Sequence, residues 1–368
     1  MKIIAKVKKI DEELAYRTTR IQFGSESLIT PLCSSNNDVP ANDVNEIYRN
    51  YSKDCLQKGA RSSEMERGLN LELKKKTRSG LNVCFVDYND SAKLTDNELG
   101  LLTDLQYQYS QIAVTPIWSG LLGSYEGEKL KELILEWNRK NIEVIETLNN
   151  KSVMGTVSTT MPRTIVGDVI DSMVDHGVTL FAIDARNRFL DNQETWMRHV
   201  IRTIKQRGLL DDTMIYVVNA RIASFSKNAD VVLARDFLNA GYGADILGGL
   251  HIPNPGAGKA KEAQMKKGLE PTCRIFDEET YGYSKMAESV VAKKLGIAQS
   301  LAYQGSKKYN LARQIAEAKV ITEALNSEKS ILPYLQTKNM IDAEKVDELK
   351  KYRKSLFEKE ATKSKWFD

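Results

Sequence analysis

Eight short apolar runs, each closing on polar residues or glycine, constrain this chain more than any other feature of its sequence. Stretches with helical periodicity lie between most of them. An apolar run without alternation is typical of a strand buried on both faces, and repeated strand–helix units favour a parallel sheet. Eight units are the number that closes a (β/α)8 barrel. The runs are Leu28–Cys33, Asn82–Asp87, Gln111–Ile117, Ser152–Val157, Thr179–Asp184, Met214–Asn219, Ala244–Leu250 and Cys273–Asp277.

We therefore predict an α/β fold, a (β/α)8 TIM barrel with a helical, basic C-terminal extension. The barrel and its N-terminal lead-in are expected over residues 1–303, and the extension over residues 304–368. Asp43 is a good N-cap, so we expect a helix from there to about Leu56. A chain of 368 residues with 42% hydrophobic residues is long and apolar enough to bury such a core.

Cysteine and histidine usage argues against a disulfide framework and against a zinc site. The four cysteines are scattered without C-x-x-C spacing, and there are only three histidines. The first ten residues are too polar for a signal peptide, and no window approaches the 18 apolar residues of a membrane span. We predict a cytoplasmic protein that has no membrane partner, metal or cofactor; a homodimer is compatible with the sequence.

Basic residues are unevenly distributed, although the net charge of +4 is mild. They concentrate in Lys74–Arg78, in Lys259–Lys267 and in the last 25 residues. Each segment alone is more often a solvated face. Three on one chain resemble the electrostatic footprint of a nucleic-acid-binding protein, so tRNA or DNA is the predicted partner.

Three aspartates close predicted strands and are the main candidates for chemistry. Asp87, Asp184 and Asp277 follow the second, fifth and eighth runs. In a barrel, strand ends meet at one mouth, where carboxylates can serve as acid and base, as nucleophiles, or as ligands of a hard cation. The alternative is that each aspartate caps the next helix.

Other strand-end residues are candidates for substrate binding. Gly248 and Gly249, followed by Leu250, would let a ligand approach the backbone closely, although a simple bend in the strand is an alternative. Arg186 and Arg221 could clamp a phosphate or carboxylate, or pair with neighbouring acids. His251 could act as acid or base, although a satisfied loop histidine is the commoner case.

Asn219 offers both a donor and an acceptor, which suits the edge of a planar base. Together with Asp184 it completes the predicted substrate-binding set.

Short motifs of the chain resemble the tRNA-guanine transglycosylase superfamily, including its DNA-modifying relatives that insert 7-deazaguanines. Arg20–Gly24 running into Leu28–Leu32 is similar to the family's opening glycine turn and first strand. Ile246–Leu250 resembles the Gly-Gly-Leu that contacts the exchanged base, and Arg274–Asp277 resembles the Phe-Asp that supplies the nucleophile.

The resemblance implies a base-exchange glycosyltransferase that replaces guanine in nucleic acid by a purine-like base. Asp277 would attack the sugar C1′, and Asp184 and Asn219 would read the base. Trp118 stands where the family has its second catalytic Asp, so Asp87 is assigned that role. The family's cysteine-rich zinc site is absent, and the Gly-Gly-Leu falls one strand later than in the family.

Two other functions remain open at this stage. One is a barrel lyase or hydrolase acting on a small phosphorylated or carboxylated metabolite, with Asp87, Asp184 and Asp277 holding a divalent metal and Gly248–Gly249 taking the phosphate. The other is a non-catalytic barrel with a structural or assembly role.

Overall fold

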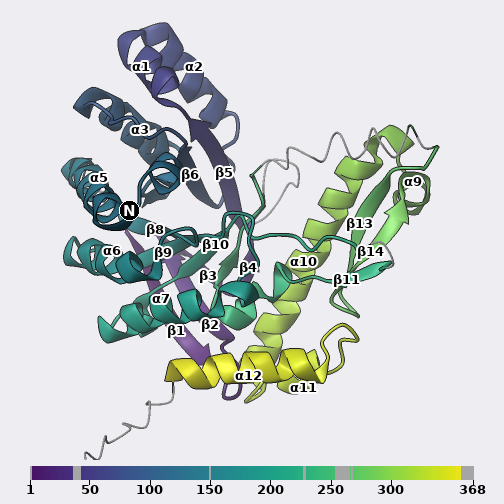
Figure 1. Ribbon diagram of the computed structural model, residues 1–368. Coiled ribbons are helices and arrows are strands. Elements are labelled where there is room, and N and C mark those ends of the chain that lie inside the picture. The colour runs from purple at the N-terminus through teal and green to yellow at the C-terminus, as the bar shows by residue number, and fades with distance from the viewer. Residues whose placement is uncertain are drawn as a thin grey trace, which may run out of the picture.

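The computed structural model shows a parallel eight-stranded α/β barrel, with a smaller sheet and the C-terminal helices on one side (Figure 1). It describes residues 2–35, 43–148, 151–226, 229–252, 266 and 268–357. Most of the basic segment Lys259–Lys267 and the last 11 residues of the chain lie outside this part. The predicted fold class is confirmed.

The barrel strands follow one another around the ring in the order β4-β12-β10-β9-β8-β7-β6-β5. Seven of them come from the first seven apolar runs. Their bounds are β4 (Leu32–Cys33), β5 (Val44–Tyr51), β6 (Leu81–Tyr88), β7 (Ile112–Val114), β8 (Ser152–Ser158), β9 (Leu180–Asp184), β10 (Ile215–Val218) and β12 (Ile246–Leu247).

The predicted helix from Asp43 to about Leu56 is wrong. This stretch forms strand β5, and helix α1 (Lys53–Arg61) begins only after Ser52, whose side chain accepts a hydrogen bond from the Cys55 backbone. Polar residues on β5 obscured the strand signal, while valine, isoleucine and tyrosine along it favour extended backbone.

A narrow seam between β4 and β5 closes the ring. The Ser35 backbone N–H donates to Val44 at 2.8 Å, and the Glu46 N–H donates to Ser35 at 2.7 Å. On its other edge β5 pairs with β6 along its whole length. Strand β5 is therefore paired much more extensively with β6 than with the end of β4.

Two apolar layers form the core because side chains alternate across each strand. On β6, Val83 and Phe85 point into the barrel, and Cys84 and Val86 pack toward the helices. The interior layer also includes residues of the N-terminal sheet, such as Ile21.

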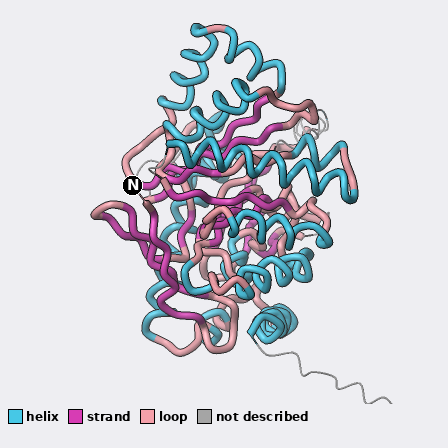
Figure 2. Tube along the Cα trace, turned by 90° about the vertical axis from the view of Figure 1, so that its left-hand side faces the viewer, coloured by secondary structure: helices cyan, strands magenta, loops and turns pink. Residues whose placement is uncertain are grey.

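That N-terminal sheet is antiparallel and consists of β1 (Ile3–Ile10), β2 (Arg17–Phe23) and β3 (Glu26–Ile29). It lies beside the barrel strands in Figure 2, and its apolar face packs on the amino-terminal end of the barrel interior. The N-terminal sheet thus covers this end of the barrel interior.

Helices surround the outside of the barrel. They are α1, α2 (Ser63–Lys74), α3 (Asp96–Gln108), α4 (Ser119–Ser124), α5 (Gly127–Leu148), α6 (Arg163–Asp175) and α7 (Glu194–Gln206), with short 3-10 turns at η1 (Asp191–Gln193), η2 (Leu210–Asp212) and η3 (Phe237–Tyr242). Thr95 opens α3 with a complete capping box, because its side chain and that of Glu98 satisfy each other's backbone N–H groups.

The eighth apolar run is not a barrel strand, contrary to prediction. It forms β13 (Thr272–Asp277), which pairs antiparallel with β14 (Gly282–Ala287); β11 (Val231–Leu233) completes this separate sheet. Its strands lie apart from the barrel, beside α9 (Glu288–Leu295) and the long α10 (Ala302–Ser327) (Figure 1). An apolar run of this length therefore did not distinguish a barrel strand from a small antiparallel sheet.

Helices continue the chain after this sheet. A 3-10 turn η4 (Gln299–Leu301) leads into α10, which is followed by α11 (Leu332–Leu335) and α12 (Ala343–Phe357). The predicted boundary at residue 303 falls in the first turn of α10. None of the described helices has the length and apolarity that crossing a membrane would need.

Candidate active site

Strand alternation brings two of the predicted aspartates to the mouth of the barrel. Asp87 follows Val83 and Phe85 on the inner face of β6, two residues further along. Asp184 has the same relation to Leu180 and Ala182 on β9. Both side chains therefore sit above the apolar interior, at the carboxyl end where barrels place their chemistry.

Arg186 joins the two carboxylates. Its Nη1 donates to Asp87 Oδ2 at 2.8 Å, and its Nε lies 3.8 Å from Asp184 Oδ2. The Arg186 side chain is 25% exposed, whereas those of Asp87 and Asp184 are 6% and 0% exposed. Ser119 also donates to Asp87. One partly accessible cation thus serves two buried acids.

The carboxyl of Asp184 has a raised pKa. Burial raises the pKa of its carboxyl from 3.8 to about 6, and the nearby Asp87 adds to this; Arg186 and the Asn219 hydrogen bond oppose the rise. A carboxyl with a pKa near neutrality populates both protonation states under ordinary conditions. That is the property a general acid or base needs.

A second group of side chains lies at the same mouth, and sequence reasoning missed its centre. The imidazole Nε2 of His251 is hydrogen-bonded to Glu46, and the Tyr216 hydroxyl donates to the same carboxylate. The Tyr48 ring stacks on His251 with centroids 4.6 Å apart and planes 7° from parallel. Glu46 and Tyr48 both come from β5, the strand that was predicted as a helix.

Asn219 connects the two groups. Its amide nitrogen donates to Asp184 at 2.9 Å and to the Tyr48 hydroxyl at 3.2 Å, and its oxygen accepts from the His251 backbone at 2.9 Å. The Tyr48 hydroxyl in turn donates to Asp87 at 3.1 Å. Asn219 also adopts a left-handed φ of 59°. The Asn219 side chain thus forms its hydrogen bonds with residues of the site. It positions Asp184, Tyr48 and His251 and does not present an unbonded amide to a base.

The paired glycines serve Glu46. A Cβ at Gly248 would lie 2.4 Å from Glu46 Oε2 and 2.7 Å from the Val217 carbonyl oxygen. The Gly249 N–H donates to Glu46 Oε1 at 2.9 Å. Gly248, Gly249 and Leu250 are half-buried at the mouth. The Glu46 carboxylate occupies the space beside the glycine backbone in which a ligand is predicted to bind.

Asp277 does not join the other aspartates, contrary to its predicted place at the mouth. It ends β13 of the small sheet, where Oδ2 accepts from the Thr280 hydroxyl at 2.9 Å and Oδ1 from the Glu279 N–H at 3.1 Å. It therefore stabilises its own turn. Arg221 is exposed, and its guanidinium lies 5.0 Å from the centroid of the Phe189 ring.

The predicted metal site made of Asp87, Asp184 and Asp277 is also wrong, because Asp277 belongs to another sheet. Across the described part of the chain, no three histidine, cysteine, aspartate or glutamate side chains gather in a way that could hold a metal ion.

No protein-family model matches the chain, and no curated protein matches it. It is similar in fold to a variant of the carboxyl transferase domain of Rhizobium etli pyruvate carboxylase with pyruvate, at 10% identity and a TM-score of 0.35, over 75% of this chain and 42% of that one. It is also similar to YagE, a prophage protein of the dihydrodipicolinic acid synthase family from E. coli K12 in complex with pyruvate. That match has 9% identity and a TM-score of 0.33, over 85% of this chain and 76% of the other.

Proposed function

We propose that the chain is an enzyme that binds a small carboxylated or phosphorylated metabolite at the barrel mouth and acts on it by general acid–base catalysis. The observation that carries this proposal is the pairing of Asp184 with Arg186. A buried carboxyl whose pKa is raised to about 6 lies beside an arginine whose side chain is one quarter exposed. This is the lyase or hydrolase alternative drawn from the sequence, without its metal.

Each group would have a distinct part in the reaction. Arg186 would bind the anionic group of the substrate through its exposed N–H groups, since guanidinium donors match carboxylate and phosphate oxygens. Asp184 would take up or deliver a proton. His251, 17% exposed and hydrogen-bonded to the fully buried Glu46, would provide a second proton-carrying group across the mouth.

The base-exchange hypothesis is less well supported by this geometry. It needs a carboxylate nucleophile at the mouth, and its predicted nucleophile Asp277 lies in the small sheet. Asp87 and Asp184 would have to take that role, although both are engaged by Arg186. A tRNA or DNA partner and a purine-like base remain predictions, as does a non-catalytic role.

Calorimetric titration with a panel of small mono- and dicarboxylates and sugar phosphates tests the proposal. We expect at least one compound to bind wild-type protein and to lose affinity about tenfold or more in Arg186→Met, because charged hydrogen bonds to the anion disappear. The control is Arg139→Met, which changes an exposed arginine of α5 that pairs with Glu143. Failure of the whole panel, or equal losses in both variants, would contradict the proposal.

A parallel incubation with tRNA and duplex DNA tests the alternative. A denaturant-resistant adduct that Asp87→Asn or Asp184→Asn abolishes would establish glycosyl transfer instead. Absence of adduct together with binding of an anionic metabolite favours the function proposed here.

A further inference from the structure

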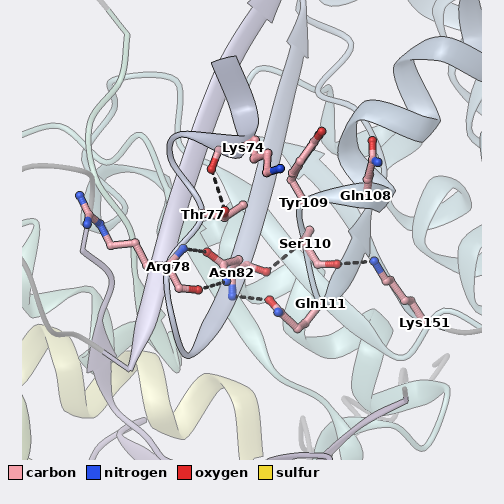
Figure 3. Close-up of a pocket in the computed structure, with 9 residues that line it drawn as sticks. All are labelled: Lys74, Thr77, Arg78, Asn82, Gln108, Tyr109, Ser110, Gln111 and Lys151. Carbon is pink, nitrogen blue, oxygen red and sulfur yellow. Dashed lines mark hydrogen bonds between the residues drawn. The ribbon is translucent and has the colours of Figure 1, made fainter. Parts of the chain in front are cut away.

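A pocket of about 460 Å³ lies at the end of the barrel opposite the candidate active site. It is formed by the end of α2 and the loop after it, the start of β6, the end of α3, and the residue before β8 (Figure 3). This volume falls in the range of small-ligand sites. Its lining residues are Lys74, Thr77, Arg78, Asn82, Gln108, Tyr109, Ser110, Gln111 and Lys151. We call it the basic pocket.

The charge of the basic pocket is entirely positive. Three of its nine lining residues are cationic and none is acidic. Among the described residues, no carboxylate pairs with Lys74 or Lys151 within ion-pair distance. Arg78 extends away from Lys151 in Figure 3, so Lys74 and Lys151 are the cations available to one ligand. Unpaired cations around a concave surface favour an anionic ligand.

Lys151 is the better fixed of the two lysines. Its ammonium donates to the Ser110 carbonyl oxygen at 2.6 Å and to that of Tyr107, and it lies 4.1 Å from the centroid of the Tyr107 ring. These contacts satisfy carbonyl oxygens at the end of α3. They use two of the three N–H groups of the Lys151 ammonium. Burial lowers the pKa of the amine, as expected of a partly desolvated cation without a carboxylate partner.

The floor of the basic pocket is held by hydrogen bonds around Asn82. The Asn82 N–H donates to Gln111 Oε1 at 2.6 Å, and the Asn82 amide donates to the Arg78 carbonyl oxygen at 2.7 Å. Ser110 donates to the Asn82 carbonyl oxygen at 2.9 Å. These bonds tie the loop after α2 to the loop before β7 (Figure 3). The lining is therefore preorganised, which lowers the entropic cost of binding.

We propose that the basic pocket binds a small molecule carrying a phosphate group, with Lys74 and Lys151 contacting the phosphate oxygens. This site is separate from the barrel mouth and does not depend on the function proposed there. Lysine is a common phosphate ligand that acts as a point charge, and the amide of Gln108 can add a neutral donor.

Calorimetric titration of the full chain with inorganic pyrophosphate and with ribose 5-phosphate tests this proposal. We expect binding at about 1 mM or tighter in low salt. Lys74→Gln and Lys151→Gln should each weaken binding about tenfold, because each removes a charged donor. Lys75→Gln is the matched control, since Lys75 is the next residue, is equally exposed and does not line the pocket.

Several outcomes would overturn the proposal. They are no binding of either probe at millimolar concentration, equal weakening by Lys75→Gln and Lys74→Gln, or loss of binding in Arg186→Met alone, which would assign the phosphate to the mouth. Because Lys151 also satisfies the end of α3, its variant is compared with wild type by thermal unfolding. If Lys151→Gln does not fold, Lys74→Gln decides the question.

Discussion

The barrel carries an arginine–aspartate cluster at each end, and the two are built very differently. At the amino-terminal end, Arg17 on β2 forms an ion pair with Asp245, and their side chains are 4% and 0% exposed. Asp245 also accepts from the Thr19 hydroxyl at 2.6 Å, the Thr30 hydroxyl at 3.1 Å and the Ile215 N–H at 2.7 Å. One acid thus has one arginine and three further donors.

At the carboxyl-terminal end one arginine side chain serves two acids. Arg186 is shared by Asp87 and Asp184, is partly exposed, and has a left-handed φ of 47°. The pKa of Asp184 is raised to about 6. The same residue types therefore serve two purposes. The carboxylate of Asp245 has an arginine of its own and joins the N-terminal sheet to the barrel, whereas Asp184 shares its arginine with Asp87 and has a raised pKa that lets it exchange a proton.

The largest effect is expected from breaking the fully compensated cluster. Asp245→Ala leaves Arg17 buried without its partner, and it should lower the free energy of unfolding by about 3–5 kcal/mol. Urea denaturation measures this. The control is Asp212→Ala, which removes the exposed partner of Lys6 and should leave the free energy of unfolding nearly unchanged. Equal costs in the two variants would show that the amino-terminal cluster does not hold the fold.

The cluster of Asp87, Asp184 and Arg186 should make the free energy of unfolding depend on pH. The folded pKa of Asp184 lies above its unfolded value, so between about pH 4 and 6 the folded chain keeps a proton that the unfolded chain releases. The contribution of Asp184 is thus most favourable at low pH and is lost as pH rises through this window, by roughly 3 kcal/mol in total.

Asp184→Asn removes this titration. We expect the unfolding free energy of the variant minus that of wild type to increase by this amount from pH 4 to pH 7, as measured by urea denaturation at each pH. A difference that stays constant with pH would mean that Asp184 titrates normally in the fold.

Crowding at Gly248 should give the next largest effect. In Gly248→Ala the new Cβ meets Glu46 and the backbone of Val217, so the strand end must shift, at a cost of about 1–3 kcal/mol. Gly100→Ala is the control, because a Cβ added there would have no atom within 4 Å and the residue sits within α3. That change should stabilise the chain by about 0.5–1 kcal/mol. Thermal unfolding of both variants checks the sign of each effect.

Removing one hydroxyl from the mouth should have the smallest effect. Tyr48→Phe deletes the group that donates to Asp87 and accepts from Asn219, at an expected cost of about 1 kcal/mol. Tyr303→Phe, on an exposed tyrosine of α10, should change stability by no more than about 0.5 kcal/mol. Chemical denaturation distinguishes the two. No difference between them would mean that the Tyr48 hydroxyl is not part of a stabilising network.

The sequence predicted the barrel because apolar runs define its strands. It also predicted part of the mouth, because the first polar residue after the apolar residues of the inner face lies at the carboxyl end of each strand. Asp87 and Asp184 were found in this way. Glu46 was missed because it lies inside β5, where neighbouring asparagines and Arg49 break the apolar pattern and Asp43 resembles a helix cap. The run of β-branched and aromatic residues from Val44 to Tyr51 was the available signal.

Asp277 was misplaced for a different reason. A five-residue run such as Cys273–Asp277 has the same composition whether it enters a parallel barrel or a small antiparallel sheet. Only the partner strand decides, and β14 lies immediately after β13 in the chain. The tight hairpin around Tyr281, whose φ is positive at 59°, makes local pairing more accessible than a distant barrel edge.

Among the described residues, β5 is joined to the end of β4 by two backbone hydrogen bonds of Ser35 and by the hydroxyls of Ser34 and Ser35, and we expect the barrel to open most easily at this edge. Amide exchange should begin at Ser35 and Glu46 before it reaches the β5–β6 ladder. Glu46 is hydrogen-bonded to His251 and to the Gly249 backbone. A transient separation of β4 from β5 would therefore displace these residues and leave Asp184 in place. A ligand or neighbouring segment that stabilises the contact between β4 and β5 would therefore increase the fraction of time for which both sides of the mouth are in place.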